Sequence, residues 1–326
     1  MMKAIVCREL GPPSVLRLED MAEPEMGPGQ VRVGIKAAGI NFPDILTVQG
    51  SYQHKPALPF IAGVETAGEV IEVASDVETV RPGDRVMMSI RPGGYAERAV
   101  ADAAVLLPTP KPFDHVTAAA FMTAYATAYH CLLMRGMLQA GEWVLINGAT
   151  GGVGLAAVEI AKLHGARIIA TGGDDGKLEV VRDYGADHVI NYRQGEFRDR
   201  VKEITGGRGV DLVYDPVGGD VFDQSLRCMA WHGRLLVVGF TSGRIPQLSV
   251  NYALIKGLSI IGCRAGEFRR HDPEAGCLMQ EDLLAMANAG KLHPHVSHVL
   301  PFERTIEAMQ LLLDRKVVGK VVVTMG

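Results

Sequence analysis

The sequence predicts an α/β fold, in which a doubly wound parallel sheet accompanies a β-rich region, on three observations. Apolar strand-like runs alternate with helix-like segments from about residue 121 to residue 263. A glycine-rich turn joins the first strand of that region to its first helix. The first 120 residues hold short alternating strands separated by Gly/Pro turns, which is typical of an irregular barrel. Strands that alternate with helices favour parallel pairing through right-handed crossovers.

The expected elements follow from the same patterns. Strands are predicted at Ala4–Cys7, Val31–Ala38, Gly68–Val73, Arg85–Ser89, Trp143–Asn147, Ala166–Thr171, His188–Asn191, Asp211–Asp215, Arg234–Gly239, Leu258–Gly262 and Lys320–Thr324. Helices are predicted at Leu155–Leu163, Lys177–Tyr184, Phe197–Thr205, Phe222–Trp231, Gln280–Ala289 and Arg304–Asp314. This order indicates that a parallel α/β domain is inserted within a β-rich domain.

The turn after Trp143–Asn147 carries the most specific functional signal. Gly148, Gly151 and Gly154 form a G-x-x-G-x-x-G spacing between a buried strand and a helix. Such a turn presents backbone N–H groups and a helix N-terminus to a pyrophosphate, and only small residues let the phosphate approach closely. The strand and helix context therefore favours dinucleotide binding over a purely structural turn.

Composition and charge exclude several classes of function. The 326 residues carry a formal net charge of −4, which gives no basic footprint for nucleic acid. Five cysteines are scattered, which argues against a disulfide framework or a zinc ribbon and fits a reducing, cytoplasmic location. Residues 1–10 are too short and polar for the apolar core of a signal peptide, and no run is suited to spanning a bilayer.

Several motifs together carry a resemblance to a known family. They are Gly39–Asp44, Ala62–Gly68, Val80–Val86, the glycine turn, Ala186–Tyr192, Asp215–Gly219 and Val238–Phe240. The chain resembles the zinc-independent quinone oxidoreductase (zeta-crystallin-like) branch of the medium-chain dehydrogenase/reductase superfamily. The resemblance runs nearly end to end. It implies a GroES-like catalytic domain made of residues 1–120 and 264–326, and a Rossmann NADP-binding domain at 121–263, with the active site between them.

The resemblance also implies that a catalytic zinc ion is absent. Zinc members place a cysteine at the position of Asn41 and a histidine at the position of Val64, and they insert a four-cysteine lobe where only the short loop 89–94 occurs here. A valine and a neutral amide are poor replacements for zinc ligands. The stretch His293, His295 and His298 could conceivably hold a metal, because alternation puts His293 and His295 on one face. A solvated strand is the favoured interpretation of this stretch.

The choice of cofactor depends on residues after the second strand of the nucleotide fold. By resemblance Gly172 takes the place of the acidic residue that binds both ribose hydroxyls, which leaves room for a 2′-phosphate. Lys177 and Tyr192 match positions that hold the 2′-phosphate and the adenosine ribose. Asp174 departs from the pattern and could act as an NAD-type carboxylate, or Asp174 and Asp175 could cap the next helix. NADPH is favoured over NADH.

The resemblance assigns further positions residue by residue. Asn41 is expected near the nicotinamide ribose, although it could simply be a turn residue. Gly152 and Val153 are expected under the pyrophosphate, together with the turn glycines. The remaining cofactor positions are Thr127, Val217, Gly218, Gly239, Phe240, Thr241, Cys263 and Arg264. Cys263 could instead be a small buried hydrophobic residue.

The expected chemistry is hydride transfer from NADPH to a quinone or to an α,β-unsaturated carbonyl compound. Without a metal, hydrogen-bond donors must polarise the substrate, so an electron-poor acceptor suits the site better than a simple alcohol. Tyr52 is the candidate proton donor or carbonyl-orienting residue, since related enoyl reductases keep a tyrosine there. Alternatively it only packs against the substrate ring. His54 and Glu65 are nearby alternatives, and Glu65 is expected to make structural hydrogen bonds.

Substrate and assembly stay open at this level. The segment 262–271 holds Arg264, Arg269 and Arg270, and it could favour an acidic or acyl-CoA substrate or be a solvated surface. An enoyl-CoA or acrylyl-CoA reductase and a non-catalytic NADPH-binding protein are therefore the alternative functions. The apolar strand Leu258–Gly262 is expected at the edge of the sheet, where the resemblance implies pairing into a homodimer.

Overall fold

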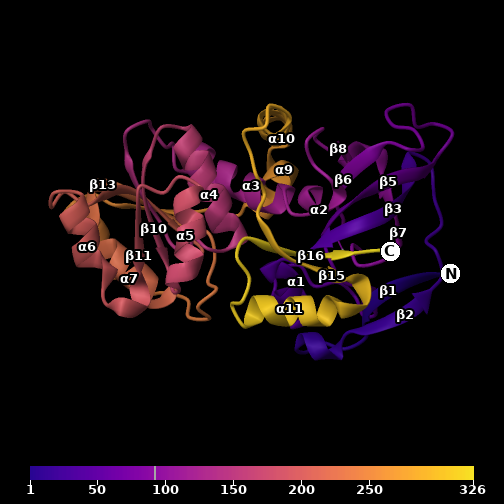
Figure 1. Cartoon of the computed structure of the whole chain (residues 1–326), viewed down its shortest axis with the longest axis horizontal. Helices are drawn as coiled ribbons and strands as arrows, with labels where there is room; N and C mark the ends of the chain where they lie inside the picture. The colour runs from indigo at the N-terminus through magenta and orange to yellow at the C-terminus, as the bar shows by residue number, and fades with distance from the viewer. Residues whose placement is uncertain (92) are drawn as a thin grey trace. The chain divides into compact units, whose positions relative to one another are not determined.

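The computed structural model describes residues 1–91 and 93–326, which form two compact units (Figure 1). The first unit comprises Met1–Met122 and Ala287–Gly326, and the second comprises Thr123–Met286. The first is β-rich and the second contains a parallel sheet with helices, which confirms the predicted fold class. The short loop predicted at 89–94 includes Pro92, which lies outside the described residues.

The second unit extends beyond the expected domain end at Cys263 because two further helices pack within it. These are α9 (Ala265–His271) and most of α10 (Pro273–Asn288). The rings of His130 and Phe268 have centroids 4.4 Å apart, and the hydroxyl of Tyr129 donates to Asp282 Oδ2 at 2.6 Å. These contacts attach residues 264–286 to the helical segment that begins the unit.

Six parallel strands in the order β11-β10-β9-β12-β13-β14 form the sheet of the second unit. Their bounds are β9 (Trp143–Ile146), β10 (Arg167–Gly172), β11 (His188–Asn191), β12 (Val210–Asp215), β13 (Met229–Val237) and β14 (Ser259–Gly262). The order reverses between β9 and β12, and in doubly wound sheets ligands bind at the carboxyl ends of the strands at that point. The predicted edge position of the 258–262 strand is confirmed, since β14 ends the order.

Helices cover both faces of this sheet. Figure 1 shows α4 (Gly152–Leu163) and α5 (Asp175–Asp183) on one side, and α6 (Phe197–Ile204) and α7 (Gly219–Arg227) on the other. The unit also holds most of α3 (Met122–Tyr129), a π-helical segment at His130–Arg135 and α8 (Asn251–Lys256). The prediction of a helix as far as Trp231 is wrong, because Met229 pairs with Val210 and residues 229–231 start β13 instead.

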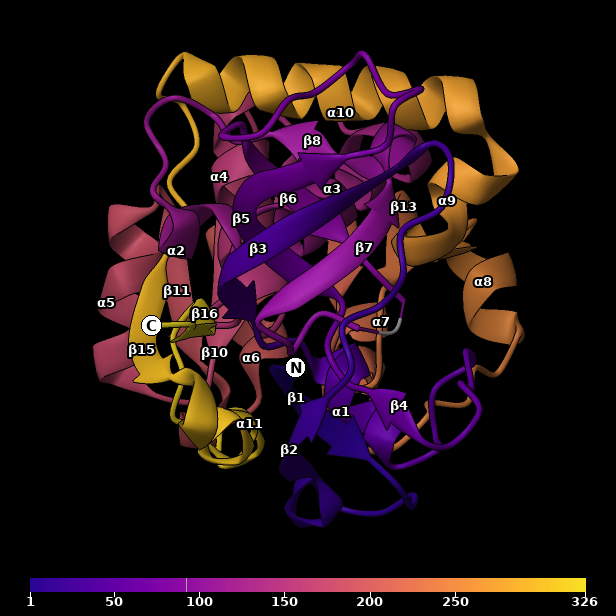
Figure 2. The same cartoon turned by 90° about the vertical axis from the view of Figure 1, so that its right-hand side faces the viewer.

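The first unit is built on a seven-stranded sheet and a three-stranded sheet (Figure 2). The larger sheet has the order β15-β16-β3-β5-β6-β8, with β7 paired to β3, and the smaller has the order β2-β1-β4. The strands are β1 (Met2–Cys7), β2 (Arg17–Met21), β3 (Gln30–Gly39), β4 (Phe60–Ile61), β5 (Glu65–Val73), β6 (Arg85–Ser89), β7 (Arg98–Asp102), β8 (Leu107–Pro108), β15 (Val296–Pro301) and β16 (Lys320–Thr324). The helices are α1 (Phe42–Val48), α2 (His115–Ala118) and α11 (Thr305–Leu313).

Apolar side chains from both ends of the chain make one core in the first unit. Val33 and Ile35 of β3 pack in the same cluster as Val321 and Val323 of β16. The C-terminal strand is therefore part of this core, and its register fixes which residues lie beside β3.

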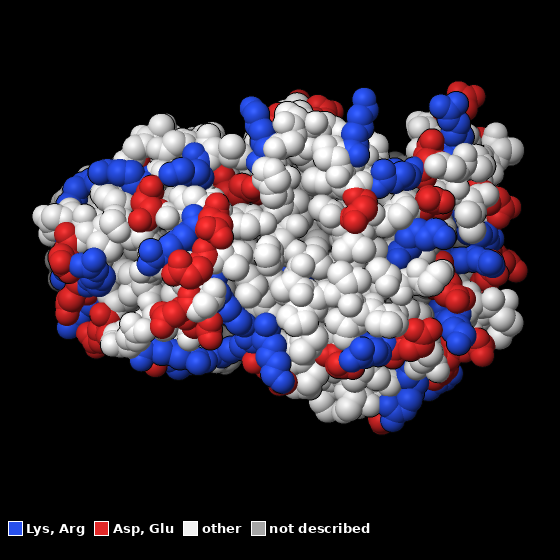
Figure 3. All heavy atoms as spheres, in the orientation of Figure 1, with Lys and Arg blue, Asp and Glu red and all other residues white. Residues whose placement is uncertain are grey.

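Three features of the surface and composition bear on the partners and location of the protein. Acidic and basic side chains are interspersed on the face drawn in Figure 3. All five cysteines are free thiols. Within residues 1–91 and 93–326, the helices are too short or too polar to cross a bilayer.

Candidate functional site

The glycine turn in the second unit is shaped by close backbone packing. A Cβ on Gly154 would collide with the carbonyl oxygen of Gly148 and lie 2.7 Å from Ala149 Cα. Gly148 has φ +57°, a left-handed conformation that disfavours a side chain. Gly151, the residue before α4, has room for a Cβ, and Gly152 and Val153 form the first turn of α4. The backbone N–H groups of this turn are thus held at the N-terminus of a helix of twelve residues.

A buried polar network lies beneath this turn, where β9, β10 and β12 end. The side chain of Asn147 donates to Ser225 Oγ at 3.0 Å and accepts from Thr171 Oγ1 at 3.1 Å. Asp215 accepts backbone hydrogen bonds from Val217 at 3.0 Å and Gly218 at 3.2 Å. Burial raises the pKa of Asp215, and these hydrogen bonds oppose the rise. The network connects the loops after three strands through side chains that are 2% exposed or less.

The surroundings of Gly172, at the end of β10, differ in part from the expectation that this glycine leaves room for a 2′-phosphate. A Cβ there would lie 2.9 Å from Leu178 Cδ2 and 3.0 Å from Thr150 Cγ2, so the chain's own side chains fill that side of Gly172. Asp174 is the N-cap of α5, since its Oδ1 accepts from the backbone N–H of Lys177 at 2.9 Å. Asp175 accepts from Asn191 and Gln194. The structural interpretation of the two carboxylates is therefore confirmed.

A phenol and a guanidinium group lie beside Gly173 rather than Gly172. A Cβ on Gly173 would lie 2.9 Å from the hydroxyl of Tyr192 and 3.1 Å from Arg193 Nε. Burial lowers the pKa of Lys177, Asp174 opposes this shift, and the positive charge of Arg193 lowers it further. An anion bound between two positive charges relieves their mutual repulsion. The structure thus places Tyr192 and Arg193 beside Gly173, and the charge of Arg193 acts on Lys177.

Most other cofactor positions predicted in the second unit cluster at the same strand ends. Thr241 donates its hydroxyl to the carbonyl of Pro216 at 3.1 Å, which connects the loop containing Gly239 and Phe240 to the loop containing Val217 and Gly218. Thr127 instead returns its hydroxyl to Thr123 O at 2.7 Å within α3. Cys263 is buried, and a hydrogen bond from the Cys131 thiol lowers its pKa.

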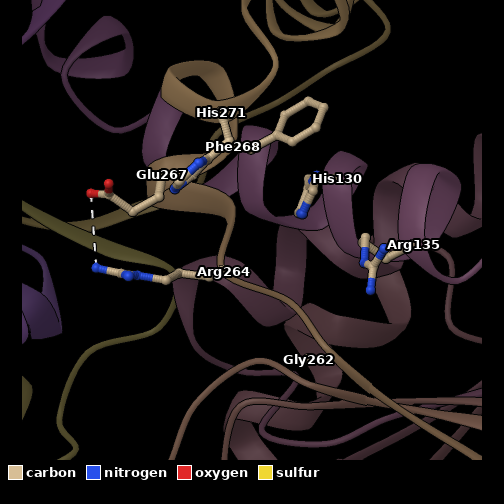
Figure 4. A pocket seen from close by; sticks show the side chains of 7 residues that line it. All are labelled: His130, Arg135, Gly262, Arg264, Glu267, Phe268 and His271. Carbon is tan, nitrogen blue, oxygen red and sulfur yellow. Dashed lines mark ion pairs between the residues drawn. The ribbon is translucent and has the colours of Figure 1, made fainter.

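A pocket of about 360 Å³ lies within the second unit, between the π-helical segment and α9 (Figure 4). Arg264 lines it and lies 4.0 Å from the carboxylate of Glu267. Glu267 also lines it, and the other lining residues are His130, Arg135, Gly262, Phe268 and His271. Arg264 and His271 of the predicted basic segment therefore line the pocket, whereas Arg270 pairs with Glu267 at 2.7 Å.

In the first unit, strand register brings three polar side chains to one place. Asn41 follows β3 and is the N-cap of α1, while Glu65 opens β5 opposite Gly39. Lys320 opens β16, whose next residue, Val321, accepts a hydrogen bond from Ile40 N–H at 3.0 Å. Gly39 must lack a side chain, because a Cβ would collide with the carbonyl of Ala119 and lie 3.0 Å from Glu65 Oε2.

Asn41, Glu65 and Lys320 form what we call the ammonium cluster. Lys320 Nζ donates to Asn41 Oδ1 at 2.5 Å and to Glu65 Oε2 at 2.9 Å. Asn41 Nδ2 donates to the same Glu65 oxygen at 3.0 Å. The exposed fractions are 7% for Asn41, 3% for Glu65 and 6% for Lys320. The expected structural role of Glu65 is confirmed, and Asn41 is more than a turn residue because both ends of its amide are engaged.

A second carboxylate lies beside the cluster. Asp44 Oδ2 accepts from the backbone N–H of Asn41 at 2.8 Å and from the hydroxyl of Tyr95 at 2.7 Å. Its Oδ1 is buried and has no hydrogen-bond partner among the described residues. Burial raises the pKa of Asp44 to about 6, although Tyr95, Asn41 and Lys320 each oppose that rise. The same burial raises the pKa of Tyr95 well above its usual value.

Tyr52 follows α1 in a loop of the first unit. Its backbone N–H donates to Leu46 O at 3.1 Å, and its side chain is partly exposed. Within the described part of the chain its phenol makes no hydrogen bond, so the hydroxyl is available to a ligand. His54 is exposed in the same loop. The first unit therefore carries both predicted catalytic residues, Asn41 before α1 and Tyr52 after it.

The histidine stretch lies at the start of the outermost strand of the larger sheet. His298 is in β15, as the strand interpretation predicts, and His293 and His295 precede it. His295 accepts the backbone N–H of Lys320 through its carbonyl at 2.9 Å. No group of three or more His, Cys, Asp or Glu side chains arranged to hold a metal occurs in the described ranges.

Sequence reasoning missed Lys320, Arg193 and the Asn147–Asp215 network. Arg193 directly follows the predicted Tyr192, so its position near Gly173 could have been inferred. Lys320 is the one charged residue of the predicted strand Lys320–Thr324. A single charge at the start of a mostly apolar strand indicates a buried charge that needs a partner. Its partners are 255 and 279 residues away in the chain, so no local pattern could identify them.

The pKa of Asp44 generates a prediction about stability. Because folding raises this pKa from 3.8 to about 6, the folded state favours the protonated carboxyl, and stability falls as the pH rises through this window. Asp44→Asn removes this titration, so the variant should gain about 3 kcal/mol relative to wild type between pH 4 and pH 7. Denaturant unfolding across that range measures the difference.

The matched control is Asp20→Asn, at an exposed position of β2. The control should follow the wild-type pH profile. An Asp44→Asn profile parallel to the wild type would contradict the prediction.

Comparison with known proteins places the chain in a family. Residues 27–111 match the family described as "Alcohol dehydrogenase GroES-like domain", and residues 152–280 match "Zinc-binding dehydrogenase". The "Quinone oxidoreductase-like protein 2 homolog" of Nematostella vectensis is 40% identical over 98% of this chain and 88% of its own length.

Two solved structures are similar over nearly the whole chain. Escherichia coli quinone oxidoreductase complexed with NADPH has a TM-score of 0.91 and 29% identity, covering 99% of this chain and 100% of its own. A mycobacterial protein complexed with NADPH has a TM-score of 0.92 and 32% identity, with the same coverage. The chain therefore belongs to the quinone oxidoreductase branch of the medium-chain dehydrogenase/reductase superfamily, as its sequence motifs predicted.

Proposed function

We propose that this oxidoreductase uses NADPH to reduce a quinone or an α,β-unsaturated carbonyl compound without a metal ion. The observation that carries the proposal is the glycine turn at the switch point of the second unit's sheet, with Lys177, Tyr192 and Arg193 gathered at the end of the neighbouring strand. Two relatives of the same fold were solved in complex with NADPH, which supports the same cofactor here.

The residues present fit the two phosphate-bearing parts of NADPH. The pyrophosphate would lie on the turn of Gly148, Gly151 and Gly154 and the first N–H groups of α4. The 2′-phosphate would be held by Arg193, which lies beside Gly173, and by Lys177, whose charge interacts with that of Arg193. Asp174 has a structural role beside this site, because its Oδ1 caps α5.

The residues do not fit a catalytic zinc ion. Val64 has no donor atom in its side chain, and the amide of Asn41 is engaged with Lys320 and Glu65. A positive charge already pairs with Glu65, and it would repel a dication. These features of the first unit support metal-independent chemistry.

The proposed chemistry is therefore carried by alignment and hydrogen bonding. When bound, NADPH supplies a hydride from its nicotinamide ring. Tyr52 would donate a hydrogen bond to the substrate oxygen, or a proton as the reduced product forms, because a phenol is protonated at neutral pH. Asn41 would hydrogen-bond the nicotinamide ribose. These roles suit an acceptor that is already electron-poor.

The pocket lined by Arg135 and Arg264 favours one alternative substrate class. Guanidinium groups recognise carboxylates and phosphates, so an acyl-CoA or another acidic enone is the second candidate substrate. Glu267 pairs with Arg264 and reduces this positive charge, which keeps the neutral quinone or enone as the first choice.

We also propose that two copies join through β14. This strand is at the edge of the sheet, and α8, which packs on β13, exposes apolar side chains. Val250, Leu254 and Ile255 are 79%, 83% and 65% exposed. An unpaired edge beside an apolar surface favours pairing with another chain. The five free thiols fit the reducing cytoplasm as the location of this dimer.

Turnover with a substrate panel tests the function. NADPH should reduce 1,4-benzoquinone, 9,10-phenanthrenequinone or an enone with saturable kinetics, and removal of metals with a chelator should leave the rate unchanged. Tyr52→Phe should lower kcat/KM on enones at least about tenfold if the hydroxyl acts in the transition state. Crotonyl-CoA as the sole good substrate would favour the acyl-CoA alternative, and tight NADPH binding without any turnover would favour a non-catalytic protein.

Substitution at the proposed phosphate site tests the cofactor assignment. Lys177→Ala and Arg193→Ala should each lower kcat/KM for NADPH by about 10- to 100-fold, the value of a hydrogen bond to a charged group, and change that for NADH little. Arg182→Ala, an exposed position of the same helix α5, is the control. A wild type that prefers NADH, or equal losses with both cofactors, would refute the assignment.

Light scattering at micromolar concentration tests the dimer. The wild type should have twice the mass of one chain, and Leu254→Glu should shift it to a monomer because a carboxylate disfavours burial. Leu163→Glu, at another exposed apolar position of the second unit, should remain dimeric. A monomeric wild type would exclude this assembly.

A further inference from the structure

The ammonium cluster depends on the arrangement of three adjacent strands. In the sheet order β16-β3-β5, Lys320 opens the first strand, Asn41 follows the second and Glu65 opens the third. Val322 pairs with Gly39 and Gly39 pairs with Glu65, so the three side chains lie at one end of the sheet. The C-terminal strand thus contributes a polar residue to a place that is otherwise built from the N-terminal part of the chain.

The hydrogen bonds of this cluster allow only one orientation of the Asn41 amide. Its oxygen accepts from the ammonium of Lys320, and its nitrogen donates to the carboxylate of Glu65. If the amide were flipped, its NH₂ group would face the ammonium and its oxygen would face the carboxylate. Both contacts would then be repulsive, and burial leaves little water to relieve them.

We infer that Lys320 is a positioning residue, which holds the amide of Asn41 in the orientation that serves the cofactor. This inference rests on the proposed role of Asn41 in NADPH binding. The ammonium fixes the amide oxygen, and Glu65 fixes the amide nitrogen while balancing the buried charge. The ammonium of Lys320 donates to Asn41 and to Glu65, and Glu65 in turn accepts from Asn41, so both of these hydrogen bonds bear on the amide of Asn41.

Paired substitutions separate positioning from folding. Lys320→Met removes the ammonium that pairs with the buried carboxylate of Glu65, so this variant should be less stable. Lys320→Met combined with Glu65→Gln removes both charges and should recover most of the stability. If Lys320 positions Asn41, the double variant should still bind NADPH at least about tenfold more weakly than wild type. Lys316→Met, an exposed lysine four residues earlier, is the control and should match the wild type.

A second comparison tests whether Lys320 acts through Asn41. Lys320→Met should weaken NADPH binding in the wild-type background, and it should add little when Asn41 is already alanine. Cofactor fluorescence titration measures both effects. Recovery of wild-type NADPH affinity in the variant that combines Lys320→Met with Glu65→Gln would overturn the inference. The two charges would then be needed only for folding.

The orientation itself is measurable without any cofactor. In protein labelled with ¹⁵N at asparagine, Asn41→Asp identifies the side-chain NH₂ signals of Asn41. Hydrogen exchange of these signals should be at least about tenfold faster in the double-charge variant than in wild type. Unchanged exchange would refute the positioning role. Failure of the wild type to bind NADPH would refute the proposed function instead, and this measurement would still decide the role of Lys320.

Discussion

The pairing of the buried Lys320 ammonium with Glu65 and Asn41 constrains the whole first unit. A charge in a protein interior is tolerated only with a partner and further hydrogen bonds, because the loss of hydration is large. Lys320 is 6% exposed, and its partners belong to the N-terminal part of the chain. The C-terminal strand must therefore lie beside β3 in one register. That register also places Val321 and Val323 in the core. It pairs Val322 with Gly39, shortly before the start of α1.

The ammonium cluster also supports the metal-independent chemistry that we propose. The family resemblance implies that Asn41 and Val64 occupy two positions at which zinc-dependent members carry metal ligands. Here the ammonium of Lys320 donates to Glu65. We propose that this ammonium, which pairs with a buried carboxylate, stands where a metal ion would otherwise supply Lewis-acid chemistry. Reduction of electron-poor acceptors needs no such acid, which makes the proposed substrates consistent with the residues.

The second unit depends on a different constraint, the close approach of backbone to backbone. Gly154 lies against the carbonyl of Gly148, and Asp215 holds the backbone N–H groups of the loop after β12. The polar network of Asn147, Thr171 and Asp215 joins the ends of three strands. Rigid strand ends of this kind present amide groups in fixed positions, so the loops need little rearrangement to receive phosphates.

Local sequence determined the fold class, most strands and helices, the glycine turn and the edge strand, because hydrophobic periodicity and glycine positions are local signals. Local sequence also left two roles for Asp174, an NAD-type carboxylate or a helix cap. The structure shows Asp174 as the N-cap of α5. Only the tertiary structure decided that residues 229–231 join β13, that Gly173 rather than Gly172 lies beside Tyr192 and Arg193, and that Lys320 meets Asn41. Each of these depends on strand pairing or side-chain packing between distant segments, and a single sequence carries no direct record of such long-range contacts.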